Sequence, residues 1–162
     1  MPRALGINPA RCVTQYRLKL NPATGQLEER NGVKVRHCLD GGHQSVLLAR
    51  DGFTGHVQTS SSVVDDLVIK MLVADAAGRN RCLIKADAPN AYMQGERQAR
   101  PQTFMQMPAA FADERADDGS KLCIQLGTPC WGEEPAGFEW QVAFEGSLLA
   151  FGWRRAEGVP CL

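Results

Sequence analysis

The most informative stretch of this sequence reads Arg81-Cys-Leu-Ile-Lys-Ala-Asp-Ala-Pro-Asn-Ala-Tyr92. Its first seven residues are mostly apolar and end on an acid, which predicts a short strand over residues 81–87. Residues 88–95 predict a turn, because Pro89 cannot continue an interior strand. A carboxylate at the end of a strand is held rigidly in place, so Asp87 is the first candidate for a functional side chain.

Two strands are predicted upstream of this stretch. Residues 12–20 alternate between apolar and polar side chains, which is the period of a half-buried strand. A turn cluster leads to a second strand over residues 33–39, where Lys34 and Arg36 share a face because side chains repeat every two residues. Residues 40–42, Asp-Gly-Gly, are expected to break that strand. The expected product is a hairpin-like ribbon that presents a row of cations.

The remaining elements are two helices and two strands. Apolar residues at spacings of three and four predict a helix over residues 63–77, capped by Ser62 and packed into the core. Strands are predicted over residues 103–107 and 121–126, and a last helix over residues 137–151. The expected order is strand, strand, helix, strand, strand, strand, helix, which is typical of an α+β fold.

The composition is that of a globular protein. The chain has 162 residues, of which 44% are hydrophobic and 22% charged, and this length can bury a core. No apolar run approaches the roughly 20 residues that cross a bilayer, and the start lacks the apolar region of a signal peptide. The protein is therefore expected to be soluble and intracellular, either cytoplasmic or nuclear, and not secreted.

The charge is unevenly distributed along the chain. Residues 1–58 hold eight Lys and Arg against four acids, a net charge of +4, and the rest of the chain carries −4. A basic region could face a polyanion such as nucleic acid or a triphosphate. An ordinary solvated surface is the alternative, and charge alone favours it.

The six cysteines do not suggest a disulfide framework, because none forms a Cys-x-x-Cys pair and the start is not secretory. His37, Cys38 and His43 form the one local cluster with metal-binding residue types. A zinc site needs four ligands and usually a close cysteine pair. These residues are therefore interpreted as parts of a strand and a turn, with zinc binding as the less favoured alternative.

Residues 84–92 resemble the first metal-binding motif of right-hand polymerases, in which an apolar strand, an Asp, three residues, an Ala and an aromatic follow one another. The chemistry accounts for this pattern. Transfer of a nucleotidyl group from a nucleoside triphosphate needs divalent metals. Hard cations such as magnesium prefer carboxylate oxygens.

Four further segments resemble the copia-type retrotransposon reverse transcriptase family, in the same order and at the same spacing. Lys34-Val-Arg-His-Cys-Leu-Asp-Gly-Gly-His-Gln44 is similar to its basic fingers motif, and residues 61–77 to its next block. Thr103-Phe-Met-Gln-Met-Pro-Ala-Ala-Phe111 is similar to the family's Tyr-Met-x-x-Pro-x-Gly-Phe strand and turn. Leu122-Cys-Ile-Gln-Leu, Trp131-Gly and Trp140 are similar to the block that carries the primer-side helix.

The resemblance covers about residues 30 to 155 and implies a domain organisation. Residues 1–30 would be a variable lead-in with a strand. Residues 31–162 would be a fragment of a reverse transcriptase domain, with the fingers and an incomplete palm of a right-hand polymerase.

The resemblance also implies roles for five residues. Asp87 would be a catalytic carboxylate that binds Mg2+ or Mn2+, with the backbone carbonyl of Ala88 assisting. Tyr92 would select the sugar by excluding a 2′-hydroxyl, and Lys34 and Arg36 would hold the triphosphate of the incoming nucleotide. The alternatives are a core aromatic for Tyr92 and an exposed strand face for the two cations.

The sequence departs from the family in two places. The family places an aromatic and a pair of adjacent aspartates on a hairpin after the last helix, and the sequence ends at Leu162 before such a hairpin. The pairs Asp65-Asp66 and Asp117-Asp118 lack apolar strand flanks. In addition, Glu134, Pro135 and Phe138 stand where the family usually has Lys, Gln and Arg, and Ser62 replaces a Pro.

The expected function is therefore that of a reverse transcriptase fragment. The family adds deoxynucleotides to a primer 3′-hydroxyl on an RNA or DNA template, as part of a retroelement polyprotein. With one catalytic carboxylate the fragment is expected to be inactive as given. The alternatives are a non-catalytic nucleic-acid-binding module and a decayed retroelement remnant.

Overall fold

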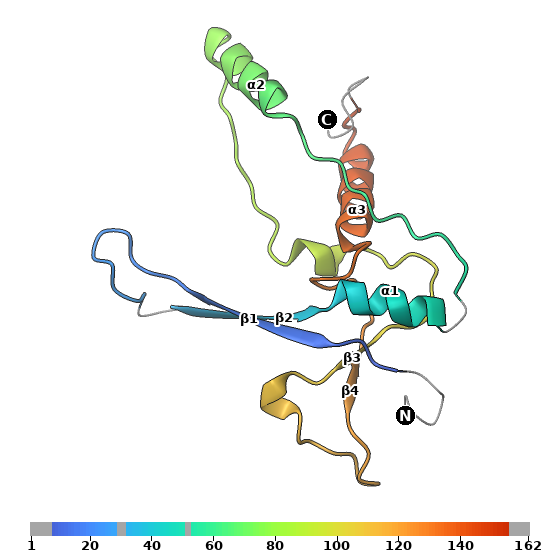
Figure 1. The fold of residues 1–162 in the computed structure, drawn as a ribbon. Coiled ribbons are helices and arrows are strands. Elements are labelled where there is room, and N and C mark those ends of the chain that lie inside the picture. The colour runs from blue at the N-terminus through green and yellow to red at the C-terminus, as the bar shows by residue number, and fades with distance from the viewer. Residues whose placement is uncertain (1–7, 29–31, 51–52, 156–162) are drawn as a thin grey trace.

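The computed structural model describes residues 8–28, 32–50 and 53–155. In this part of the chain two small two-stranded antiparallel sheets combine with helices in an α+β arrangement (Figure 1). The strands are β1 (Cys12–Leu18), β2 (Val33–Leu39), β3 (Phe104–Gln106) and β4 (Cys123–Gln125). The α-helices are α1 (Gly41–Arg50), α2 (Asp66–Gly78) and α3 (Ala136–Ala150), with 3-10 turns η1 (Ala91–Gln94) and η2 (Ala109–Phe111).

The ribbon of β1 and β2 confirms the two strands predicted at the start of the chain. The strands pair antiparallel, with Arg17 opposite Lys34 and Gln15 opposite Arg36. Directly opposed residues point to the same side of a ribbon, so the three cations share one face. The prediction of a half-buried β1 is wrong, however, since Tyr16 is 72% exposed and no second layer of the described chain covers this end of the ribbon (Figure 1).

Helix α1 begins at Gly41, where the sequence predicts only a break after the strand. The Asp40 carboxylate accepts a hydrogen bond from the His43 amide at 3.2 Å and so caps the helix. The next residue, Gly41, allows its backbone to lie close to that of Gly132. A Cβ at position 41 would lie only 2.3 Å from the carbonyl oxygen of Gly132. Gly41 therefore begins a helix that packs against a distant turn.

The core lies where the end of β2, α1 and the β3–β4 pair meet. Its buried members are Ala10, Leu39, Leu47, Met105, Leu126 and Cys130. Ala10 also forms a parallel bridge with Met105, and its amide donates to the Phe104 carbonyl at 2.7 Å. Residues near the start of the described chain are thus part of the fold.

The predicted strand over residues 81–87 is wrong. This segment has no regular secondary structure, and Ile84 is 93% exposed. A strand needs a neighbour to accept and donate its backbone hydrogen bonds, and no strand of the described residues pairs with this one. The segment is instead an extended connection that returns from α2 to η1 (Figure 1).

Helix α2 differs from its prediction in both its start and its packing. It begins at Asp66, and its N-cap is Asp65, whose carboxylate accepts from the Leu67 amide at 2.7 Å, rather than Ser62. It also does not pack into the core: Leu67 is 63% and Met71 62% exposed. Two extended connections hold α2 away from α1 and from the ribbon (Figure 1).

The C-terminal elements agree with their predictions. Strands β3 and β4 form an antiparallel pair inside the two ranges predicted for them, and α3 begins and ends within one residue of its predicted bounds. Among the described helices none is both long and apolar enough to span a membrane.

Candidate functional site

An open cleft of about 730 Å³ lies between the ribbon and the N-terminal half of α3. Segments from four parts of the chain form its walls: β2, the connection before α2, the turn that leads into η1, and residues 131–141. Its lining residues are Lys34, Arg36, Ser61, Ser62, Asp87, Ala88, Pro89, Asn90, Ala91, Tyr92, Trp131, Gly137, Trp140 and Gln141. Its volume falls in the range of small-molecule sites.

All five residues named by the family resemblance line this cleft. Lys34 and Arg36 reach it from β2, while Asp87, Ala88 and Tyr92 reach it from the turn after the extended connection. The chain separates these two groups by about fifty positions. The fold therefore brings together residues that the resemblance assigns to one site.

Local contacts hold the turn that carries Tyr92. Asn90 adopts a left-handed conformation with φ of 51°, which asparagine tolerates better than most residues. The Gln94 side chain donates to the Pro89 carbonyl at 2.6 Å and closes the turn. Tyr92 is partly exposed at the cleft rather than buried in the core, contrary to the alternative interpretation of it.

The cations of the cleft have no carboxylate partner among the described residues. Neither Lys34 nor Arg36 forms an ion pair there, and the buried Nε of Arg36 has no hydrogen-bond partner in the described part of the chain. The Arg36 guanidinium lies 5.7 Å from the ring centroid of Trp131, a cation–π contact. Two uncompensated cations at one cleft attract an anionic ligand.

Three aromatic side chains line the same cleft: Tyr92, Trp131 and Trp140. The Trp140 ring stacks on Phe144 with centroids 5.3 Å apart. Aromatic faces of this kind bind nucleobases by stacking. Trp131 and Trp140 were not among the site residues expected from the sequence, because an aromatic side chain predicts packing in the core equally well.

Asp87 is the single carboxylate among the lining residues, and it is exposed. The described residues contain no group of three or more His, Cys, Asp or Glu side chains arranged to hold a metal ion. Asp87 with the Ala88 carbonyl does not supply the ligands for the two metals of nucleotidyl transfer, so the protein residues of the cleft do not by themselves fit a magnesium pair.

The histidines of the zinc alternative have other partners. His37 Nδ1 bonds to the Thr14 hydroxyl, and His43 Nδ1 accepts from the Arg11 amide, both at 3.2 Å. No metal-binding group exists around them within the described ranges. His37 lies in β2 as expected, whereas His43, which was expected in a turn, lies in the first turn of α1.

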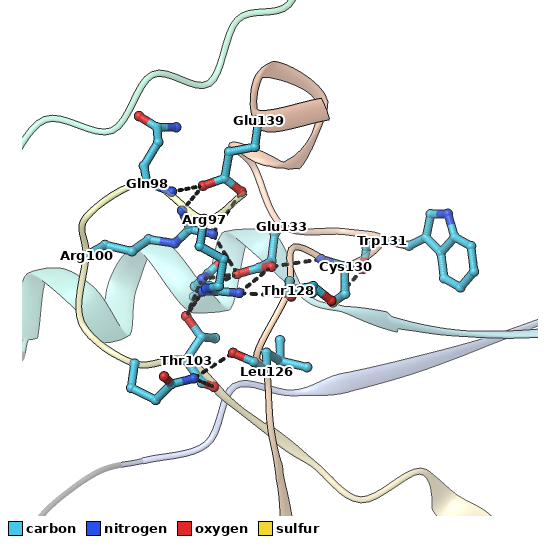
Figure 2. A network of polar contacts seen from close by, with 12 residues as sticks. Arg97, Gln98, Arg100, Thr103, Leu126, Thr128, Cys130, Trp131, Glu133 and Glu139 are labelled. Carbon is cyan, nitrogen blue, oxygen red and sulfur yellow. Dashed lines mark hydrogen bonds and ion pairs between the residues drawn. The ribbon is translucent and has the colours of Figure 1, made fainter. Parts of the chain in front are cut away.

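A buried network of charges joins the loop before β3 to residues 130–133 and to α3 (Figure 2). The Glu133 carboxylate accepts two hydrogen bonds from Arg97, each of 2.9 Å, and one from Gln44 of 3.0 Å. Arg100 lies between Glu133 and Glu139 and pairs with both. All four charges are therefore compensated inside the protein, as buried charges must be.

Arg100 stays charged within this network. Burial opposes its charge, but the hydrogen bonds and negative charges of Glu139 and Glu133 outweigh burial and raise the pKa of Arg100 above its ordinary value. The sequence carries no local signal for this network, because its arginines and glutamates are more than thirty positions apart and follow no period.

Comparison of the chain with protein-family models, with curated proteins and with solved structures finds no match in any of the three. The functional assignment therefore depends on the motifs of the sequence and on the geometry of the cleft.

Proposed function

We propose that this chain contributes the fingers and part of the palm of a copia-type reverse transcriptase, and that its cleft binds a deoxynucleoside triphosphate. One observation carries the proposal. The five residues that the family resemblance singles out, from two distant segments, line one cleft of suitable size. The aromatic side chains beside them add a surface for a base.

Each group of residues has a task in this proposal. Lys34 and Arg36 bind the phosphates, since cationic donors form strong charge-assisted hydrogen bonds to phosphate oxygens. Tyr92 lies beside the sugar and excludes a 2′-hydroxyl by its bulk. Trp131 and Trp140 offer faces for the base.

The proposal concerns binding and assigns no chemical step to the described cleft. Nucleotidyl transfer depends on Mg2+ or Mn2+, which would activate the primer hydroxyl and neutralise the leaving pyrophosphate. Asp87 would be one protein ligand to such an ion, and the described lining supplies no second carboxylate. In a complete enzyme the partners would be a template–primer and deoxynucleoside triphosphates.

A second candidate, a non-catalytic nucleic-acid-binding module, is favoured by the shape of the ribbon surface. A further cavity of about 490 Å³ is lined by Gln15, Tyr16, Arg17, Lys34 and Arg36. It shares Lys34 and Arg36 with the cleft and adds Arg17, so it continues the basic surface along the ribbon. Binding of an oligonucleotide that depends on Arg17, without binding of a mononucleotide, would favour this candidate.

The test of the proposal is metal-free binding of dATP by equilibrium dialysis. Arg36→Ala removes a charged donor worth roughly 1.5–3 kcal/mol, so we expect the dissociation constant to rise about 10- to 100-fold. Lys70→Ala is the matched control, because Lys70 is an exposed cation on α2 outside the cleft. Absence of saturable binding by the unaltered protein, or equal effects of both variants, would contradict the proposal.

Asp87→Asn tests two effects of the Asp87 carboxylate: its repulsion of phosphate without metal and its binding of Mg2+. Without metal we expect tighter dATP binding, by a few-fold, because the substitution removes repulsion between Asp87 and the phosphates. With Mg2+ present we expect the order to reverse, since the amide is a poorer ligand for a hard cation. The same dialysis assay with and without Mg2+ measures both, and an unchanged dissociation constant under both conditions would place Asp87 away from the phosphates.

A further inference from the structure

Glu133 is the side chain of the buried network that touches the largest number of separate segments. Its carboxylate is fully buried and accepts from Gln44 on α1 and from Arg97 and Arg100 in the loop before β3. The bidentate geometry of the Arg97 contact fixes the plane of the carboxylate as well as its position.

The same carboxylate also folds back onto its own turn. Glu133 Oε2 accepts from the Cys130 amide at 2.9 Å, and the Glu133 amide donates to the Cys130 carbonyl at 3.2 Å. These two bonds close the four-residue turn 130–133. Trp131 and Gly132 lie between the closed ends, so their backbone has little freedom.

This turn is attached to the strand that carries the cleft cations. The Leu39 amide donates to the Trp131 carbonyl at 2.7 Å, and Gly132, with φ of 91°, lies so close to Leu39 that a Cβ there would meet its carbonyl oxygen at 1.9 Å. The Trp131 ring in turn contacts the Arg36 guanidinium at 5.7 Å. Contacts thus run from Glu133 through Trp131 to Arg36.

We infer that Glu133 is a positioning residue for the cleft: by closing the turn 130–133 it sets the Trp131 ring, and through that ring the guanidinium of Arg36. The inference rests on the proposed function for the identity of the ligand, but the geometry of Trp131 is a property of the free protein. The described hydrogen-bond partners of the Glu133 carboxylate lie outside the cleft lining, so Glu133 acts through its turn; they are Gln44, Arg97, Arg100 and Cys130.

Glu139 provides a matched control for the alternative that Glu133 only stabilises the fold. Its carboxylate is equally buried and shares Arg100 with Glu133. It differs in its other contact, the amide of Gln98, which lies outside the turn 130–133. The backbone of Glu139 belongs to α3, whose own hydrogen bonds hold the neighbouring Trp140.

The experiment compares Glu133→Gln with Glu139→Gln. Each leaves Arg100 with less negative charge, so we expect both to lower the thermal midpoint, and Glu133→Gln by more because Glu133 also pairs with Arg97. The indole N–H signal of Trp131 in two-dimensional NMR, assigned through Trp131→Phe, should shift in Glu133→Gln and stay in place in Glu139→Gln. The dissociation constant for dATP should rise on the order of tenfold in the first variant and remain unchanged in the second.

Equal displacement of the Trp131 signal in both variants, or in neither, would overturn the inference. If Glu133→Gln does not fold, the double variant Arg97→Gln/Glu133→Gln replaces the ion pair by two neutral amides. The double variant is then compared with Glu139→Gln in the same way. If the unaltered protein does not bind dATP, the proposed function fails while the NMR comparison still decides the role of Glu133.

Discussion

At the residue scale two groups of charges differ in their surroundings. Arg97, Arg100, Glu133 and Glu139 are buried and paired, whereas Lys34 and Arg36 face the cleft without a carboxylate partner among the described residues. Removing one partner of a buried pair leaves an uncompensated charge, which costs roughly 3–5 kcal/mol. The paired charges therefore maintain the fold, and the unpaired ones remain available to a ligand.

The Cys130 thiol gives a prediction about pH. Its burial, followed by the negative charge of Glu133, raises its pKa from the ordinary value of 9.0 to about 11. The folded state thus holds this proton at a pH where the unfolded chain loses it. Stability from this source is complete below about pH 9 and falls as the pH rises towards 11.

Urea unfolding at pH 8 and at pH 10.5 checks this expectation, with Cys130→Ala as the comparison. The free energy of unfolding should fall between the two pH values, and it should fall less in the variant. Cys12, Cys38 and Cys123 shift in the same direction because of their burial, so some pH dependence should remain. An equal fall in the free energy of unfolding in both proteins would contradict a raised pKa for the Cys130 thiol.

At the element scale α2 is the helix least supported by its surroundings. Ala76 is its one buried residue, so its stability depends on local terms and it can unfold without the rest of the protein. Asp65→Ala removes the N-cap acceptor of the Leu67 amide and should cost about 1 kcal/mol of helix stability. Amide hydrogen exchange in the first turn of α2 measures this loss.

Ser62→Ala is the control for the N-cap prediction. Ser62 is bonded to Gln141 through its backbone amide, which the substitution keeps. Its effect on exchange in α2 should therefore be negligible. A larger effect of Ser62→Ala than of Asp65→Ala would show that Ser62, as expected from the sequence, is the N-cap of α2.

At the scale of the whole molecule, the core is small and many large apolar side chains remain exposed to solvent. Large apolar side chains are exposed on α2, on α3 and just beyond α3, including Leu67, Met71, Leu72, Val142, Phe144 and Phe151. Surfaces of this kind promote association in water. We expect light scattering after size exclusion to show a mass that grows with protein concentration, together with strong binding of a hydrophobic dye. A monodisperse monomer with a sharp, cooperative thermal transition would contradict this expectation.

The sequence predicted elements well where a local period is decisive. Alternation predicted the strand β1, which pairs with β2, and the helix predicted over residues 137–151 is α3. The failures occurred where distant partners decide the outcome. Residues 81–87 have the composition of a strand but no strand beside them, and Gly41 begins a helix because Gly132 approaches it closely.

The candidate site shows the same division. Lys34, Arg36, Asp87 and Tyr92 could be named from the sequence, because the segments that contain them resemble polymerase motifs. Their presence at one cleft is a property of the folded molecule alone. The aromatic walls and the burial of Glu133 likewise depend on which segments meet.

The sequence by itself thus determines local backbone conformation and the types of side chain available for chemistry. Neighbouring residues set the backbone preference, and each side chain has its own functional group. The tertiary structure decides which cations stay unpaired, which carboxylates are buried, and whether an apolar helix face is covered. These properties arise from contacts between residues far apart in sequence, and such contacts leave no periodic signal in the chain.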